Sequence, residues 1–531
     1  MGAMSAKRAS TESTDDERPS SSDGPWLGDA CSLVDAFRAG ERSPKEELQA
    51  TLDAIADSDL NCFSFLDPER ALAAADDADL SKPFGGVPVG IKELEQVEGW
   101  PDTGGSLVFK DRIATFTSEA TRRFIVDGGA NPVGLTTSSE FGGLNVSVTK
   151  LNGVCHNPWR HGRTVGGSSG GSASAVAGGL VSLASGGDGG GSIRIPAGYT
   201  GLFGMKGTFG RVSRGPHAFS RPATVVLGCL ARSVRDAARY YDVCAGVDPR
   251  DPTSLPDPGG WERNLGSTDL RGRKVAILPS IAGVTLEPGV EAEIRDRAAA
   301  LVELAGMEVV ELRLELPNLA AQWAMGNLST LLAELDRLWP ACAADLTDEI
   351  ALGLILAQTT YNLNLAAVAE DQRLKANEAM AGAFDEVDYI ISATNPGPAF
   401  AAEASTSSPT ATFLDSAKAS TAARVAFRGL MGGVRMANGA FPRLSNRLIE
   451  MVVERVPDLV TMGGLTIISN IYGNPAVSIP AGDVDGLPVG MQVLARHHRD
   501  AELFDLGYAY EREIGWPMVA PSVLSRELAP A

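Results

Sequence analysis

The sequence predicts an α/β fold with a large, mixed, partly parallel twisted sheet and helices on both of its faces. Residues 271–278 and 308–312 are short apolar runs typical of strands, and a helical pattern at 287–305 lies between them. Residues 389–393 form a further run of the same kind. Strands that alternate with helices in this way indicate a partly parallel sheet. No repeat or change of composition divides residues 26–525, so we expect a single folded domain there.

The composition restricts the function before any motif is considered. With 531 residues, 44% of them apolar, the chain can bury a large core. Its formal net charge of −20 would repel a phosphate backbone, so we expect no nucleic-acid partner. The six cysteines show no C-x-x-C pair, which favours free thiols in a reducing, cytoplasmic compartment. No run of about 18 apolar residues is present, so no membrane span is expected.

The N-terminal part of the chain contains a polar tail and two helical patterns. Residues 1–25 are rich in Ser, Asp, Glu and Pro, so we expect a disordered tail or a tag. The segment Ser43-Pro-Lys-Glu46 is a capping box with Pro at the first helical position, and it predicts a helix that runs through Ile55. A second helix is predicted over residues 68–79.

A short strand over residues 85–92 follows, and it ends in a lysine. The segment Gly-Gly-Val-Pro-Val-Gly-Ile-Lys92 is apolar up to its last residue. In one interpretation, Lys92 extends its stem along the strand and reaches solvent. In the other, burial lowers the lysine pKa and leaves a neutral amine that can act as a base. This segment alone leaves both interpretations open.

The second half of the chain is mostly helical in pattern over residues 313–385 and 411–457. We expect a helical substrate-specificity region at about 313–460. The aromatic residues there, Trp323 among them, have helical spacing, which favours core positions over a pocket. The other predicted elements, in order, are a helix at 118–127, a strand at 131–135, a hairpin-like pair at 473–482 and 486–492, and a final helix at 500–514.

A glycine- and serine-rich stretch carries the strongest chemical signal. It contains two hydroxyls, Ser168 and Ser192, which lie 24 positions apart. Three glycines, Gly189, Gly190 and Gly191, stand directly before Ser192, so a row of bare amide donors would lie beside a nucleophile, as an oxyanion hole requires. The five histidines have no recognisable triad context, which leaves Lys92 as the credible base.

These motifs together resemble the amidase signature family, and the similarity spans most of residues 85–515. The segments that carry it are Gly-Val-Pro-Val-Gly-Ile-Lys92, Gly166-Gly-Ser-Ser-Gly-Gly-Ser172, Gly187-Asp-Gly-Gly-Gly-Ser-Ile-Arg-Ile-Pro196, Gly201-Leu-Phe-Gly-Met-Lys-Gly207 and the late Gly473-Asn-Pro-Ala and Gly486-Leu-Pro-Val-Gly-Met-Gln492. The sequence departs from the family pattern at Glu93, where the family usually has Asp, at Gly187, where Thr is frequent, and at Gly207, where Pro is frequent. None of the three departures removes a catalytic group.

The resemblance implies a role for each residue of the serine-rich core. Ser192 is implied to be the acylated nucleophile, and Ser168 the bridging serine, held by a cis peptide. Lys92 is implied to be the base that draws the Ser192 proton through Ser168. The amides of Gly189, Gly190 and Gly191 are implied to form the oxyanion hole, and Asp188 and Arg194 to support the loop. No metal or organic cofactor is implied, and the substrate-binding residues stay unknown.

The implied function is hydrolysis of a carboxamide C–N bond through an acyl-serine, with ester and carbamate bonds open to the same chemistry. The implied partners are a small-molecule amide, ester or carbamate, with no nucleic acid, no membrane and, as a family-level expectation, a homodimer. The alternative is the amidase-like glutaminase subunit of a tRNA-dependent amidotransferase. A phosphate- or nucleotide-binding module is disfavoured, because the core has neither G-x-x-x-x-G-K-[ST] nor G-x-G-x-x-G.

Overall fold

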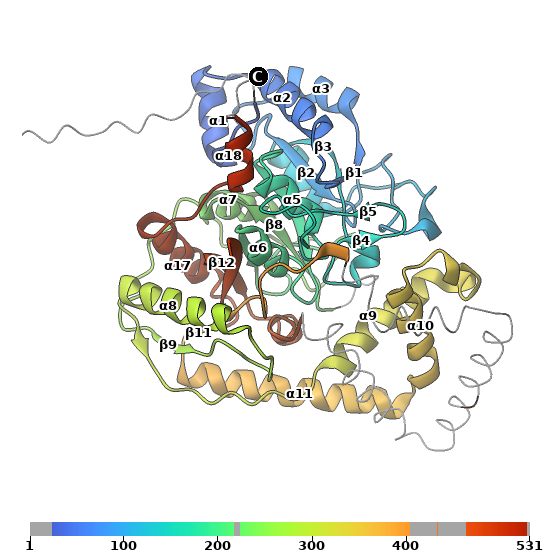
Figure 1. Cartoon of the computed structure of the whole chain (residues 1–531), viewed down its shortest axis with the longest axis vertical. Helices are drawn as coiled ribbons and strands as arrows, with labels where there is room; N and C mark the ends of the chain where they lie inside the picture. Colours follow the sequence, from blue (N-terminus) through green and yellow to red (C-terminus); the bar gives the residue numbers. More distant parts are fainter. Residues whose placement is uncertain (1–23, 217–222, 404–432, 434–462, 528–531) are drawn as a thin grey trace, which may run out of the picture.

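The structure of the chain is a computed structural model that describes residues 24–216, 223–403, 433 and 463–527 (Figure 1). The tail predicted for residues 1–25 therefore lies almost wholly outside the described residues. The same holds for the helical pattern predicted at 411–457 and for most of the C-terminal half of the predicted specificity region.

In the described part of the chain, eleven strands form one mixed sheet, as the sequence predicts. In spatial order the strands are β1 (Phe63–Leu66), β3 (Asn131–Thr136), β2 (Pro88–Lys92), β6 (Leu183–Asp188), β8 (Val226–Ala231), β7 (Phe203–Lys206), β12 (Ala476–Val484), β13 (Leu487–Ala495), β11 (Tyr389–Ala393), β9 (Lys274–Ile277) and β10 (Glu308–Val309). Strand β2 runs parallel to both β3 and β6, and β9 runs parallel to both β10 and β11. The remaining pairs are antiparallel.

Helices surround the sheet (Figure 1). They are α1 (Ala30–Ala39), α2 (Pro44–Ala56), α3 (Pro68–Asp76), α4 (Glu119–Arg122), α5 (Gly170–Ala177), α6 (Arg194–Thr200), α7 (Val234–Cys244), α8 (Pro288–Ala305), α9 (Ala320–Leu335), α10 (Asp348–Thr360), α11 (Leu363–Glu386), α16 (Ile467–Tyr472), α17 (Asp500–Glu513) and α18 (Pro521–Glu527). Short turns of helix are η1 (Leu107–Phe109), η2 (Arg123–Asp127), η3 (Glu140–Gly142), η5 (Asp336–Leu338) and η6 (Ala341–Ala344), and β4 (Val148–Thr149) pairs with β5 (Gly153–Val154).

Local sequence signals explain where several of these elements begin. The Ser43 side chain accepts from the Glu46 amide, and the Glu46 carboxylate accepts from the Ser43 amide, so the predicted capping box starts α2. The predicted hairpin-like pair is β12 and β13, which join at Asp485 and Gly486. Both turn residues have positive φ, at 56° and 72°, which suits a tight two-residue turn.

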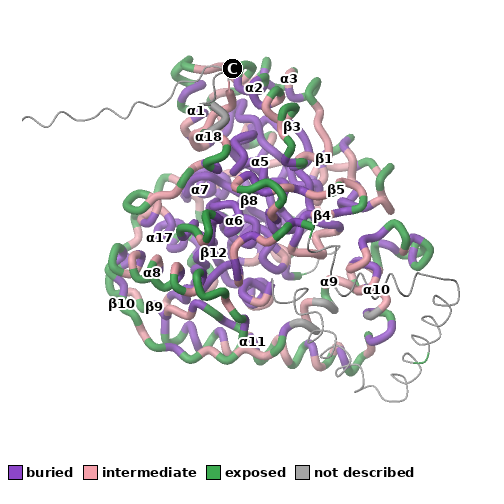
Figure 2. Tube along the Cα trace, viewed as in Figure 1, coloured by how far each residue is buried: buried purple, intermediate pink, exposed green. Residues whose placement is uncertain are grey.

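The core has two layers, one on each face of the sheet. Successive side chains of a strand point to opposite faces, and Leu183 and Ala184 of β6 accordingly enter different buried clusters. The larger cluster contains residues of α1, α7, α8 and α17. The smaller one contains residues of α2, α3, α5 and α6. Figure 2 shows that the buried trace concentrates in this central part, whereas α11 alternates between buried and exposed positions.

Within the described ranges, no single helix is long and apolar enough to cross a membrane. The bent pair α10 and α11, at 109° to each other, would satisfy the requirement by length and composition alone.

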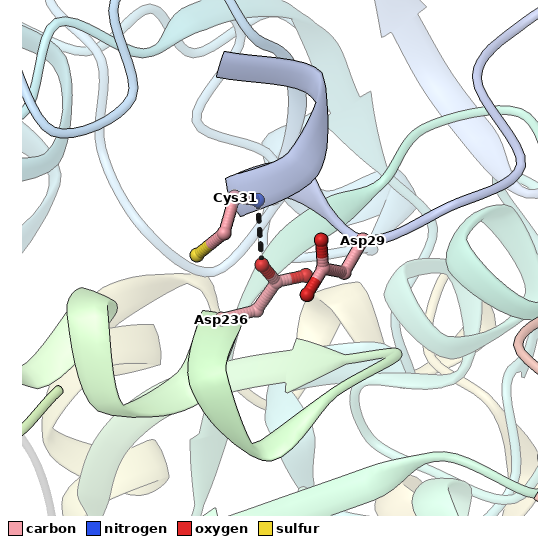
Figure 3. A group of neighbouring side chains, drawn as sticks. All are labelled: Asp29, Cys31 and Asp236. Atoms are coloured by element: carbon pink, nitrogen blue, oxygen red, sulfur yellow. Dashed lines mark hydrogen bonds between the residues drawn. The ribbon is translucent and has the colours of Figure 1, made fainter. Parts of the chain in front are cut away.

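Two helix N-termini meet at a cluster of three side chains, Asp29, Asp236 and Cys31, shown in Figure 3. Their ligand atoms lie within 4.8 Å of one another, as those of a metal site would. The Asp236 carboxylate, however, accepts from the amides of Ala30 and Cys31, both at 2.9 Å. Asp29 accepts from the Ser32 amide and the Ser233 hydroxyl. Since all four carboxylate oxygens already accept hydrogen bonds at the starts of α1 and α7, the cluster is explained as reciprocal helix capping.

The carboxyl of Glu511, on α17, adds a titratable group to this cluster. It accepts from the Val234 amide at 3.2 Å. Burial, joined by the charges of Asp236 and Asp29, raises the pKa of Glu511 to about 8. An unfolded glutamate ionises at about 4.3, so between these two pH values the folded protein binds more protons than the unfolded chain. The Glu511 contribution to stability therefore falls as pH rises through this window.

We expect the Glu511→Gln variant to gain stability relative to the wild type as pH rises from 5 to 9, because glutamine keeps an acceptor for Val234 and carries no charge. The relative gain in unfolding free energy should be roughly 2–4 kcal/mol, since each pKa unit corresponds to about 1.4 kcal/mol. Urea unfolding at pH 5, 7 and 9 measures it. Glu513→Gln, an exposed change on the same helix, is the control. A constant difference between Glu511→Gln and wild type across this range would contradict the prediction.

Candidate active site

Lys92 lies at the end of β2, between the parallel strands β3 and β6, and it is only 2% exposed. The interpretation in which its amine reaches solvent is therefore wrong. The Nζ atom donates to the hydroxyls of Ser168 and Ser169, both at 2.8 Å, and to the carbonyl of Gly187 at 3.2 Å. The Lys92 amide donates to the Ser185 hydroxyl of the neighbouring strand, which fixes the strand end beside the serine-rich turn.

The turn that carries Ser168 comes directly before α5. The peptide bond between Gly167 and Ser168 is cis, as the resemblance implies. The carbonyl of Ser168 accepts from the Ser139 amide at 3.3 Å, and the amide of Ser169 donates to the carbonyl of Ser192 at 3.2 Å. This last bond joins the backbone of the two serine segments. The Ser168 hydroxyl thus contacts the Lys92 amine, and the backbone of the next residue contacts the segment of Ser192.

Ser169 takes part in the site more directly than sequence reasoning predicts. Its hydroxyl contacts the Lys92 amine and accepts from the Gly187 amide at 3.3 Å. It thus ties the amine to the end of β6. The signal available in the sequence is its place next to Ser168 at the N-terminus of a predicted helix, a position where serine commonly only caps the backbone.

Ser192 is buried, at 5% exposed, and it stands just before α6. Among the described residues no hydrogen bond joins its hydroxyl to that of Ser168, so the last link of the implied relay is open in this structure. The amides of Gly189 and Gly190 donate to no described acceptor. The Gly191 amide, in contrast, donates to the Asp188 carboxylate at 2.7 Å. Two of the three predicted oxyanion donors are therefore available.

The glycines before Ser192 are required by close packing on their Cα atoms. A Cβ atom on Gly190 would lie 2.7 Å from Nε1 of Trp323, on α9. Gly191 has φ of +122°, a conformation that residues with side chains rarely adopt, and its Cα faces Thr466. Ile467 lies on the same side of Gly190. Residues from α9 and from the start of α16 therefore form one wall beside the loop.

A buried ion pair holds this loop in place. Asp188 and Arg194 are both completely buried, and their side chains meet at 2.9 Å. Burial alone would raise the pKa of Asp188, but the Arg194 guanidinium outweighs it and holds the pKa well below its usual range. The same carboxylate accepts from the amides of Gly191, Ile193 and Arg194, and so shapes the turn that carries Ser192.

The guanidinium of Arg194 extends the network to the C-terminal part of the chain. It donates to Ser469 at 2.7 Å, to Asn470 at 2.6 Å and to Gln492 of β13. Asn470 in turn donates to the Asp188 carboxylate and to its carbonyl. Sequence reasoning identifies Asp188 and Arg194 as structural support, and it misses their partners because these lie more than 270 residues away.

Comparison with known proteins gives a consistent family assignment. The sequence model of the Amidase family matches residues 46–431. The A subunit of the glutamyl-tRNA(Gln) amidotransferase of Salinispora tropica is 31% identical over 93% of this chain and 98% of its own length. The corresponding protein of Chromohalobacter salexigens, which has the same name, is 29% identical over 94% of this chain and 98% of its own length.

Solved structures share the fold. A bacterial aryl acylamidase of the amidase signature family has a TM-score of 0.78 at 23% identity, covering 95% of this chain and 99% of its own. A 6-aminohexanoate cyclic dimer hydrolase has a TM-score of 0.79 at 24% identity, covering 94% and 99%. The A subunit of the Thermotoga maritima glutamyl-tRNA(Gln) amidotransferase has a TM-score of 0.67 at 23% identity, covering 88% and 92%. At these identities the likeness shows the fold alone.

The expected partner set, which is restricted to a small-molecule amide, ester or carbamate and excludes nucleic acid, is wrong. The relatives from Salinispora and Chromohalobacter are named as subunits of an enzyme that acts with a tRNA. The error has a physical cause. A net charge of −20 describes the whole surface, and it does not exclude a local patch or a neighbouring subunit that contacts RNA.

We expect Asp188→Asn to lower the free energy of unfolding by about 3–5 kcal/mol, because the change keeps the side-chain shape but leaves the buried Arg194 charge unpaired. Chemical denaturation at neutral pH measures the loss. Asp76→Asn, which breaks the exposed pair with Lys45, is the matched control and should change stability little. Equal effects of the two variants would show that the buried pair does not hold the loop.

Proposed function

The chain belongs to the amidase signature family and is a hydrolase that acts on C–N bonds, and on that premise we propose that it cleaves a carboxamide through an acyl-serine intermediate on Ser192. The observation that carries the proposal is the buried Lys92 amine, 2.8 Å from the Ser168 hydroxyl, beside a glycine loop with two available amides. These groups place a base, a bridging hydroxyl and an oxyanion site next to one another.

In the proposed first half-reaction, the Ser192 oxygen attacks the amide carbon. The Ser192 proton passes to Ser168, and the Ser168 proton passes to an uncharged Lys92 amine. The negative charge that forms on the amide oxygen meets the amides of Gly189 and Gly190. Each preorganised donor of this kind is worth about 3–4 kcal/mol in the transition state.

The first half-reaction ends when the C–N bond breaks and the leaving nitrogen takes the proton back from Lys92 through Ser168. Ammonia or an amine departs, and the acyl group stays on the Ser192 oxygen. In the second half-reaction, water attacks the ester carbon and the same relay accepts its proton. The bond between the acyl carbon and the Ser192 oxygen then breaks, the relay returns the proton to that oxygen, and the acid is released. The relay thus serves as base and then as acid in each half-reaction.

We infer that the amide is that of glutamine and that the chain is the glutaminase subunit of a tRNA-dependent amidotransferase. Support comes from the two sequence relatives, which match 93–94% of this chain over 98% of their own length and are named as subunits of such an amidotransferase. In this setting the product ammonia is passed on to a second active site, and a partner subunit contacts the tRNA.

A second candidate is a hydrolase of amides that carry an apolar group, the function that the sequence alone favours. The observation behind it is the apolar wall at the glycine loop, where Trp323 and Ile467 lie against Gly190. An aryl or aliphatic substituent would bury its surface there, at about 25 cal/mol per Å².

The domain organisation and location complete the proposal. We propose that residues 26–525 form one catalytic unit and that the helices within about 313–460 supply substrate specificity. We also propose a cytoplasmic location, which the six free, buried cysteines support.

We expect Ser192→Ala to lower amide turnover by about 10³-fold or more, because the nucleophile is lost and no other group can hold the acyl chain. Ammonia release from glutamine, benzamide and hexanamide, and aniline release from acetanilide, measure it. Ser174→Ala, which removes a buried α5 hydroxyl bonded to the His156 carbonyl, is the matched control. Full turnover by Ser192→Ala would refute the acyl-serine mechanism.

The same assay separates the two candidate functions. Preference for glutamine, together with copurification of a second subunit that raises the ammonia yield, supports the amidotransferase subunit. Preference for benzamide, hexanamide or acetanilide by the isolated chain supports the hydrolase of apolar amides.

A further inference from the structure

Three carbonyls of the loop before Ser192, those of residues 188, 189 and 190, are each held by a side chain from a distant part of the chain. Asn470 Nδ2 donates to the Asp188 carbonyl at 2.8 Å, and Trp323 Nε1 donates to the Gly189 carbonyl at 3.3 Å. Thr466 Oγ1 lies 2.6 Å from the Gly190 carbonyl. The Thr466 hydroxyl has one proton to donate, and the carbonyl of Gly463, its other possible acceptor, is farther away at 3.2 Å. The Gly190 carbonyl is therefore the nearer acceptor for that proton.

We propose that Trp323, Thr466 and Asn470 are positioning residues that hold the oxyanion loop through these three carbonyls. Asn470 and Trp323 aim the two available amides, and Thr466 fixes the peptide unit that follows them. The inference rests on the proposed function, because it gives the Gly189 and Gly190 amides their catalytic meaning. We call the three side chains the carbonyl clamp. None of them needs to touch the substrate in order to act.

The geometry of the peptide unit connects the clamp to the donors. In a trans peptide the C=O and the following N–H point in opposite directions. A carbonyl held on one side therefore directs the next amide to the other side. The unit between Gly190 and Gly191 shows this, since Thr466 holds its carbonyl while its N–H points to the Asp188 carboxylate. By the same rule, Asn470 directs the Gly189 amide and Trp323 directs the Gly190 amide.

The loop needs such support from outside. Three successive glycines have no side chains with which to restrain themselves, and glycine has the largest backbone freedom of any residue. Asp188 fixes the amide of Gly191 but not those of Gly189 or Gly190. Preorganised donors contribute to the rate only when they do not have to reorient during the reaction. Asn470 and Trp323 supply this restraint for the two amides that the carboxylate leaves available, and Thr466 holds the unit next to them.

The clamp also joins separate regions of the fold at the reacting group. Trp323 belongs to α9, in the region predicted to set specificity, whereas Thr466 is the N-cap residue of α16 and Asn470 lies within that helix. Trp323 is only partly buried, and it packs against the main core. The position of α9 is thereby connected to the oxyanion loop through one indole N–H.

The test compares Thr466→Val, which keeps the shape but loses the donor, with Thr466→Ser, which keeps the donor. Trp323→Phe removes the indole N–H and keeps an aromatic ring. Thr330→Val, which removes a hydroxyl bonded to the Gly326 carbonyl on α9, is the matched control. Asn470 is left unchanged, because it also pairs with Arg194 and its loss would disturb the buried ion pair.

Two measurements are made on each variant. The first is kcat and KM for whichever of glutamine, benzamide, hexanamide and acetanilide the wild type turns over fastest, with labelling of Ser192 by phenylmethanesulfonyl fluoride in parallel. The second is hydrogen–deuterium exchange of the peptide that contains residues 188–191. Thermal unfolding is recorded for all variants to detect any loss of the fold.

We expect Trp323→Phe to lower kcat by about 10–100-fold, because loss of the indole N–H leaves the Gly190 amide, an oxyanion donor, free to reorient. Thr466→Val should lower kcat by about 10-fold with KM within about 2-fold, because it loosens the peptide unit that follows that donor. Thr466→Ser should recover kcat to within about 3-fold, and Thr330→Val should match the wild type. Exchange at 188–191 should accelerate in Thr466→Val and Trp323→Phe at unchanged melting temperature.

Wild-type kcat and exchange in Trp323→Phe would overturn the inference, as would equal losses in Thr466→Val and Thr466→Ser. A wild type that releases no product and is not labelled at Ser192 would instead refute the proposed function. In that case the exchange measurement still decides whether the clamp orders the loop.

Discussion

One buried carboxylate, that of Asp188, determines the shape of the site. It lies at the end of β6, one strand away from the end of β2, where Lys92 stands. Its two oxygens accept from three backbone amides of the turn that carries Ser192 and from the guanidinium of Arg194. A charge so deeply buried is stable only when each lone pair is satisfied. The hydrogen bonds that this buried ion pair requires thus define the path of the backbone around the nucleophile.

Sequence reasoning works well where the signal is local. The capping box of α2, the strand–helix alternation and the two serine motifs are each defined by residues close together in the sequence. The structure shows the capped helix and the mixed sheet that these patterns predict. Burial of Lys92 and the bond from the Gly191 amide to Asp188 are different in kind. They depend on the packing of strands and on the path of a turn, which no local pattern encodes.

The residues that sequence reasoning misses share one property. Each holds a backbone carbonyl or an ion pair far from itself along the chain, as Thr466 does for Gly190 across 276 residues. Threonine, asparagine and tryptophan each occur in many structural settings, so their types carry no chemical signal in isolation. Closeness in space is also not sufficient by itself. The ligand atoms of Asp29 and Asp236 lie as near to each other as those of an ion site, and only their hydrogen bonds to two helix starts show that they are caps.

The indole of Trp323 has a consequence for how the chain can diversify. It forms part of the wall beside the glycine loop, and it also holds the carbonyl of Gly189. Exchange of this residue for a differently shaped side chain changes recognition and rate in a single step. A change of this residue that gives new substrate selectivity would therefore also lower the catalytic rate. The rate would recover only if another N–H or O–H group came within hydrogen-bond distance of the Gly189 carbonyl oxygen.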